Sequence, residues 1–112
     1  MEVKLRNVED ILVFDFYGEL DETNADKTFT GVYEMIWDFA NKKIIFNLAS
    51  LKYLNSKSIG YIADVFSNLD DNNWKMHITN CDEWVKDVLE LVGITTIIPT
   101  VDTEEEAIAA MK

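Results

Sequence analysis

The spacing of apolar residues changes several times along the chain, and each change marks the edge of a predicted element. Residues 3–7 alternate between apolar and polar side chains, as a half-buried strand does. Residues 11–17 are β-branched and aromatic and stop at Gly18, so they predict a central strand. The turn at residues 9–10 pairs these two strands as a hairpin.

The segment from Glu22 to Ala40 predicts a helix, because its apolar residues recur at spacings of three and four. This stripe consists of Phe29, Val32, Tyr33, Ile36, Trp37 and Ala40. Gly31 costs such a helix about 1 kcal/mol relative to alanine and therefore indicates close packing at that point. Residues 43–48 form a nearly continuous apolar run, which is typical of a strand covered on both faces.

A polar loop at residues 49–55 precedes a second predicted helix at residues 56–69. Residues 74–79 alternate again and predict a strand. A third helix is expected to start at Asn80, because Asn80 and Glu83 have the spacing of a capping box. Gly93 is suited to the left-handed position that ends a helix.

Residues 97–101 predict a last, edge strand, because Pro99 cannot donate to a ladder. Thr103 is expected to cap a final helix that begins with three glutamates. The resulting β-β-α-β-α-β-α-β-α order predicts a single small α/β domain over residues 1–112, with a mostly parallel mixed sheet of about five strands and about four helices.

Charge and composition narrow the classes of function. The formal net charge of −11 repels phosphate backbones and anionic lipids, so neither nucleic-acid binding nor membrane-surface binding is expected. Membrane insertion is not expected either, because the longest apolar run, Ala107–Met111, is far shorter than the ~20 residues of a spanning helix. The start of the chain has no signal-peptide core, and a cytoplasmic protein is the default expectation. The three tryptophans, Trp37, Trp74 and Trp84, belong either to the core or to an interface, and exposure beside the second helix would indicate a partner.

The usual catalytic arrangements are missing from the sequence. The four glycines are scattered and form no phosphate-binding loop. His77 alternates with apolar residues in a predicted strand, which favours a structural or surface role over that of a base. Cys81 stands alone; a lowered thiol pKa at a helix start is the alternative to a structural role. We therefore expect no catalysis, no metal site and no cofactor.

The segment at residues 51–62 contains the most informative polar cluster. It joins a buried strand to the start of the second helix, and the carboxyl ends of strands are where sites in open α/β sheets lie. The simpler interpretation is that Asn55 or Ser56 only caps the helix. An enzyme with Ser56 as nucleophile is a third alternative, against which stands the lack of a base.

Taken together, five short patterns resemble the STAS domain, the fold of bacterial anti-sigma factor antagonists. They are the turn Gly18–Asp21, the strand and its continuation at residues 44–54, the helix start at residues 55–60, the glycine-closed helix and isoleucine-rich strand at residues 89–98, and the acidic segment at residues 103–108. The resemblance covers nearly the whole chain. Within the helix start, Ser56 and Gly60 match the family pattern, whereas Asn55, Lys57 and Ser58 depart from it.

The resemblance implies a protein-interaction module that binds an anti-sigma factor with serine kinase activity, the ATP being bound by that partner. It also implies phosphorylation of Ser56, which would release the partner through the added charge. Residues implied in partner binding are Glu19, Asp21, Asn55, Lys57 and Ser58. The substitutions at positions 55, 57 and 58 leave open an alternative: an accessory subunit of a lipid-transport ATPase or a stress-signalling complex, docked without phosphorylation.

Overall fold

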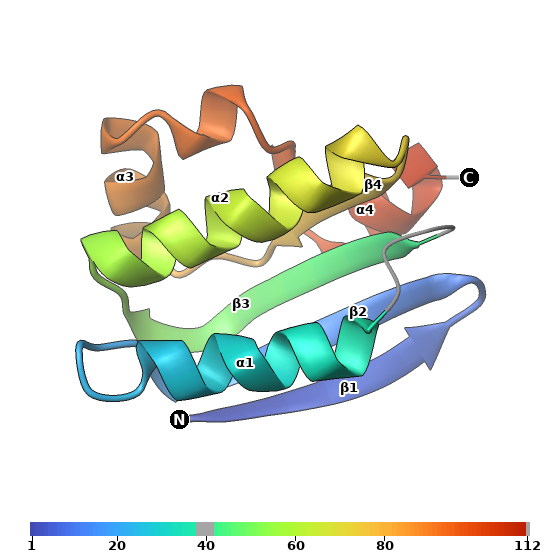
Figure 1. Cartoon of the computed structure of the whole chain (residues 1–112). Helices are drawn as coiled ribbons and strands as arrows, with labels where there is room; N and C mark the ends of the chain where they lie inside the picture. Colours follow the sequence, from blue (N-terminus) through green and yellow to red (C-terminus); the bar gives the residue numbers. More distant parts are fainter. Residues whose placement is uncertain (38–41, 112) are drawn as a thin grey trace.

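The computed structural model describes residues 1–37 and 42–111, and its strands and helices follow the predicted order (Figure 1). The strands are β1 (Glu2–Val8), β2 (Ile11–Glu19), β3 (Lys43–Tyr53), β4 (Lys75–Thr79) and β5 (Thr100–Val101). The helices are α1 (Ala25–Ile36), α2 (Ser56–Asp71), α3 (Glu83–Leu91) and α4 (Glu104–Met111), with a 3₁₀ turn, η1 (Ile94–Thr96), after α3.

Within the described residues, five strands form one mixed sheet in the order β1-β2-β3-β4-β5. The β1–β2 hairpin is antiparallel, and the other neighbours are parallel. Parallel neighbours need crossover connections, which α1, α2 and the α3–η1 segment supply. The predicted fold class is therefore confirmed. Because β2 and β3 are parallel, their carboxyl ends meet at the same edge of the sheet, where α1 and α2 begin.

Two apolar clusters cover the two faces of the sheet. The larger one joins the sheet to α1, α2 and α3, and at its centre the rings of Phe14 and Phe46 meet edge to face, with centroids 5.6 Å apart. The smaller one seats Ala107 and Met111 of α4 against strand residues such as Ile45. Figure 1 shows α1 and α2 side by side across the sheet, with α3 beyond the start of α2.

The first predicted helix is too long at both ends. It begins at Ala25 and ends at Ile36, and Trp37 takes a left-handed conformation (φ 39°) that removes its side chain from the apolar stripe. Trp37 is 81 % exposed, so of the two alternatives for this residue the core is excluded. Ala40 lies outside the described residues. The close packing expected at Gly31 is also wrong, because an added Cβ would meet no heavy atom within 4 Å.

The third strand continues through the predicted loop as far as Tyr53. It does so because β2 pairs with it beyond a register shift, with Tyr17 opposite Ser50 and Glu19 opposite Tyr53. This pairing partner is distant in sequence and leaves no signal in the loop itself. The continuation brings the end of β3 to the Gly18–Asp21 turn.

The third helix starts at Glu83, not at Asn80 as the capping pattern predicted. Asn80 adopts a left-handed conformation (φ 58°), which asparagine tolerates better than most residues, and so ends β4 in a turn. Gly93 is left-handed as predicted (φ 83°), and Thr103 Oγ1 accepts the amide of Glu106 at 3.2 Å. The last strand shrinks to Thr100–Val101 because the amides of Ile97 and Ile98 both donate to the carbonyl of Ile94 and so continue the turn after η1.

Candidate functional site

The Gly18–Asp21 turn lies against the end of β3. Gly18 has φ +109°, a conformation that favours glycine, and it lies at a register shift in the pairing of β2 with β3. The amide of Leu20 then donates to the carbonyl of Tyr53 at 2.9 Å, and the Leu20 side chain is fully buried. These contacts fix the turn beside the connection from β3 to α2 and leave Glu19 exposed.

Asp21 organises the loop into α1. Its Oδ1 accepts the amide of Thr23 at 2.9 Å, the hydroxyl of Thr23 at 2.6 Å and the amide of Asn24 at 3.1 Å. The hydrogen bond from the Thr23 side chain, followed by those from the backbone, lowers the pKa of the Asp21 carboxyl. Asn24 Nδ2 donates to the carbonyl of Glu19 at 2.8 Å. The turn therefore holds a fixed, ionised carboxylate near the end of β3.

A complete capping box builds the start of α2. The Asn55 Oδ1 accepts the amide of Ser58 at 3.0 Å, and the Ser58 Oγ accepts the amide of Asn55 at 2.9 Å. Ser58 is fully buried. Asn55 thus caps α2, while Ser58 has no surface with which to contact a partner. Its predicted role in partner binding is wrong, because its hydroxyl is turned inward to close the cap.

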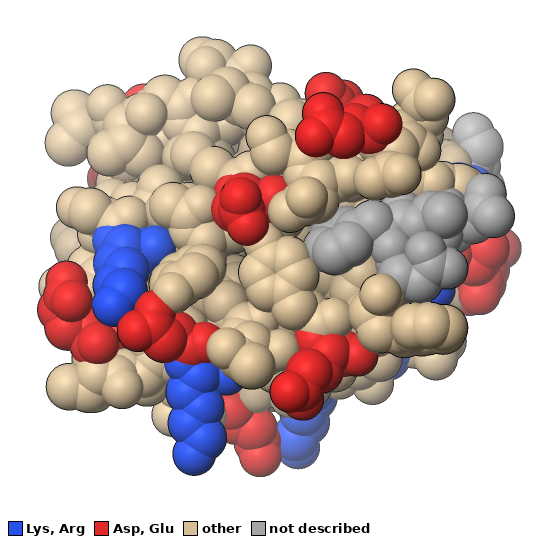
Figure 2. All heavy atoms as spheres, viewed as in Figure 1, with Lys and Arg blue, Asp and Glu red and all other residues tan. Residues whose placement is uncertain are grey.

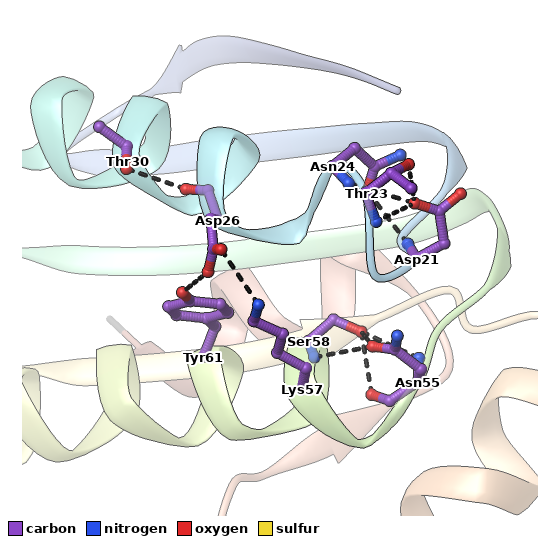
Figure 3. A network of polar contacts seen from close by, with 9 residues as sticks. All are labelled: Asp21, Thr23, Asn24, Asp26, Thr30, Asn55, Lys57, Ser58 and Tyr61. Atoms are coloured by element: carbon purple, nitrogen blue, oxygen red, sulfur yellow. Dashed lines mark hydrogen bonds and ion pairs between the residues drawn. The ribbon is translucent and has the colours of Figure 1, made fainter.

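Ser56, between these two capping residues, is exposed, and its hydroxyl makes no hydrogen bond within residues 1–37 and 42–111. The first amides of a helix have no carbonyl four residues back. The capping box engages the amide of Ser58, so the amides of Ser56 and Lys57 remain available to a further acceptor. Figure 3 shows the Asn55–Ser58 box at the same end of the molecule as the Asp21 loop.

Lys57 points away from Ser56 and toward α1. Its Nζ lies 3.0 Å from Asp26 Oδ2, and the hydroxyl of Tyr61 donates to the other oxygen of the same carboxylate (Figure 3). The Tyr61 hydrogen bond and then Lys57 lower the pKa of Asp26. Tyr61 also stacks on Phe29, with ring centroids 5.1 Å apart. These contacts tie the first turn of α2 to α1, so the lysine charge is directed to Asp26.

On the other side of α2, a shallow groove of about 270 Å³ separates the start of α2 from α3. We call it the Trp84 groove; it is lined by Tyr53, Leu54, Asn55, Ser56, Ile59, Trp84, Val88 and Val92. The rings of Tyr53 and Trp84 stack at 5.6 Å with an interplanar angle of 16°, although both remain substantially exposed. In Figure 2 the surface over α3 and η1 is mostly uncharged.

His77 and Cys81, the candidate base and the candidate thiol, are both unsuited to catalysis. His77 is buried in β4, and its Nδ1 has no hydrogen-bond partner among the described residues. Burial, reinforced by Lys75, lowers the pKa of His77. Cys81 precedes α3 instead of opening it, and burial raises the pKa of its thiol to about 11, so the alternative of a lowered thiol pKa is wrong. In the described part of the chain, no three acidic, histidine or cysteine side chains gather as metal ligands.

The structure therefore brings Glu19, Asp21, Asn55, Ser56 and Lys57 to one edge of the sheet. Sequence reasoning did not assign Tyr53 or Trp84 to this site. The available signal for Trp84 was its residue type alone, because its place beside Ser56 depends on how α3 packs. Tyr53 was hidden in a segment that we predicted as a loop.

The comparisons with known proteins agree with this architecture. Residues 2–107 match the STAS domain family, and the chain belongs to that family. It is 20 % identical over 112 residues to the anti-sigma F factor antagonist of Paenibacillus polymyxa, an alignment that covers 100 % of this chain and 96 % of the relative. It is thus a STAS domain similar to anti-sigma factor antagonists.

Two solved structures show the likeness of fold. The Thermotoga maritima protein TM1081 superposes with a TM-score of 0.91 at 22 % identity, covering 97 % of this chain and 93 % of the other. The Bacillus cell fate determinant SpoIIAA in its phosphorylated form gives a TM-score of 0.72 at 21 % identity, covering 99 % and 100 %. None of the described helices is long and apolar enough to span a bilayer.

Proposed function

We propose that this STAS domain is an anti-sigma factor antagonist: it binds an anti-sigma factor through the Gly18–Asp21 turn and the start of α2, and the partner's serine kinase activity phosphorylates Ser56. One observation carries the proposal. Ser56 is exposed and its hydroxyl is unbonded among the described residues, whereas the polar side chains on both sides of it in sequence are already engaged. The similarity to a phosphorylated relative supports the same assignment.

The modification is chemically simple at this position. The Ser56 oxygen attacks the γ-phosphorus of ATP bound to the partner, a phosphoester forms, ADP leaves and the hydroxyl proton is lost. The product gains about −1.5 to −2 charges at neutral pH. The amides of Ser56 and Lys57 and the helix dipole favour an anion there, so the fold tolerates it. The partner surface that covered an uncharged hydroxyl then has to accommodate a dianion, and it dissociates.

A serine kinase encoded by a gene that neighbours this one would be the enzyme with which to test the proposal. Incubation with ATP should add one phosphate, which mass spectrometry places on Ser56 and which Ser56→Ala abolishes. Ser58 is an internal control, because its buried hydroxyl should stay unmodified. Ser56→Asp should weaken binding of the unmodified partner by about tenfold or more, equivalent to ~1.4 kcal/mol. Phosphate at another residue, or equal binding by Ser56→Asp and the wild type, would contradict the switch.

A second candidate keeps the docking surface but removes the kinase: an accessory STAS subunit of a lipid-transport ATPase or stress-signalling complex. The observation that favours it is Lys57, an exposed cation directly after Ser56 whose ammonium is held by Asp26. In that case charge reversal at Glu19 should break a complex that Ser56→Ala and Ser56→Asp leave unchanged. Neighbouring transporter genes in place of a kinase gene would point the same way.

A further inference from the structure

The outer surface of α3 presents an apolar stripe in which Trp84 and Leu91 remain exposed, while Val88 between them is half-buried against the core. Val85 and Leu89 face the core and are fully buried. Trp84, Val88 and Leu91 follow each other at spacings of four and three, so they lie on one side of the helix. Trp84 is 46 % exposed and Leu91 is 87 % exposed. Contiguous exposed side chains of this size are characteristic of an interaction site.

The stripe continues into the Trp84 groove. Val88 and Val92 line the groove from α3, while Leu54 and Ile59 line it from the start of α2. Leu54 and Ile59 are almost completely buried and belong to the core, so this side of the groove is rigid. The groove is therefore an apolar channel with a fixed wall on one side and a helix face on the other.

Carboxylates border the stripe on its other side. Glu83, Asp87 and Glu90 are exposed, and their spacing places them together on the flank of α3 that faces away from the groove. None of the three makes an ion pair with another described residue; on this helix the cation is Lys86, which lies 3.6 Å from Asp102. The chain as a whole has a formal net charge of −11. The border of the stripe is thus acidic and uncompensated.

We propose that the Trp84 groove and the α3 stripe bind an amphipathic helix of a partner protein, with lysines or arginines along the edge that meets Glu83, Asp87 and Glu90. The apolar anchors of such a helix recur every three or four residues and match the spacing of Trp84, Val88 and Leu91. A second copy of this chain is the wrong occupant on charge grounds, because pairing two such surfaces would bring six carboxylates together.

This inference rests on the proposed function in one respect: it describes the helix that the same partner would place beside Ser56. Ser56 lines the groove on the side that meets the apolar face of the helix. A phosphate there would be forced against apolar side chains and lose its hydration. The acidic border lies on the opposite side, so the lysines or arginines that it attracts stand away from that phosphate and do not neutralise it.

Two synthetic helical peptides test the assignment directly. Both carry the same leucine stripe; one is flanked by lysines and the other by glutamates. Titrated into the ¹⁵N-labelled chain, the lysine peptide should shift the amide signals of residues 84–92 and 54–59, and the glutamate peptide should not. The triple variant Glu83→Lys/Asp87→Lys/Glu90→Lys should weaken the lysine peptide by about tenfold or more. Trp84→Ala should weaken it as well, through loss of the aromatic anchor.

A matched triple variant, Glu34→Lys/Asp70→Lys/Asp71→Lys, changes the net charge by the same amount at exposed positions away from the groove. It should bind the lysine peptide more tightly than the α3 triple variant does. Equal loss in the two triple variants, equal binding of the two peptides, or shifts that map elsewhere would overturn the proposal. So would self-association of the unbound chain in sedimentation experiments that Trp84→Ala abolishes, because the occupant would then be a second copy.

The peptide titration needs no kinase, and phosphorylation of Ser56 needs no peptide. Failure of the lysine peptide to bind the unmodified chain, when the kinase does phosphorylate Ser56 of that chain, overturns the helix inference and leaves the proposed function intact. Binding of the lysine peptide to a chain that no neighbouring kinase modifies supports the groove and contradicts the switch.

Discussion

The start of α2 and the outer side of α3 face each other across the Trp84 groove, and they are built in opposite ways (Figure 1). At the start of α2, local hydrogen bonds engage the neighbours of Ser56 and leave its hydroxyl exposed. On α3 the N-cap residue, Asp82, makes no side-chain capping hydrogen bond, and large apolar side chains stay in water. The start of α2 is suited to modification of Ser56, and the outer side of α3 is suited to contact with a partner. Regulation and binding are therefore assigned to different sides of the groove.

The largest effect on the free energy of unfolding should distinguish the buried side of α3 from its exposed side. Leu89→Ala removes a fully buried side chain from the main core and should lower the free energy of unfolding by about 2–5 kcal/mol. Leu91→Ala changes a side chain in water and should alter that free energy by less than about 0.5 kcal/mol. Urea denaturation measures both. Comparable losses would show that the fold needs the outer stripe, contrary to its assignment as a free surface.

The thiol of Cys81, in the segment before α3, should react slowly with alkylating reagents. Burial raises the pKa of the Cys81 thiol to about 11, and the charged form is what reacts. At pH 8 the thiolate fraction should be roughly 100-fold below that of an unperturbed thiol, since two pKa units separate them. The rate of alkylation by iodoacetamide should therefore be low at pH 8 and still rise above pH 10. A rate that levels off near pH 9 would mean that Cys81 has the ordinary thiol pKa.

The two walls also differ in how far the sequence predicts them. The cap of α2 depends on residues three positions apart, and its helix start and exposed Ser56 were predictable from that segment alone. The start of α3 was mispredicted, because Asn80 fits a capping pattern and a left-handed turn equally well and only the packing of β4 decides between them. Trp84 lies at the site because of the way α3 packs, which the local sequence does not predict.

A similar reason explains the other errors. The continuation of β3 to Tyr53 depends on pairing with a strand more than thirty residues earlier, across a register shift that no local pattern reveals. Trp37 follows the helical spacing but lies one residue beyond the end of α1. Local patterns thus predicted the order of the elements, whereas their ends, on which the site is built, required the assembled sheet.

The next largest effect concerns the capping box. Asn55→Ala removes the acceptor for the Ser58 amide and should lower the free energy of unfolding by about 1 kcal/mol, within a range of roughly 0.5–2. Ser56→Ala is the matched neighbour and should change it by less than about 0.5 kcal/mol. The two variants then separate stability from signalling, because only Ser56→Ala should abolish phosphorylation. If Ser56→Ala were the more damaging of the two, Ser56 would be a structural residue.

The smallest effect distinguishes two glycines that the fold does not require. An added Cβ at Gly31 in α1 or at Gly60 in α2 would meet no heavy atom within 4 Å, so alanine should stabilise either helix by about 0.5–1 kcal/mol. Gly60 lies one turn after Ser56, on the same side of α2. A partner seated on Ser56 would approach the backbone at Gly60, and Gly60→Ala should weaken that complex while Gly31→Ala leaves it unchanged. Calorimetry of both variants, alone and with the partner, measures both quantities. Equal partner affinity in the two variants would place the docking surface away from this side of α2, because the added methyl group would then meet only solvent.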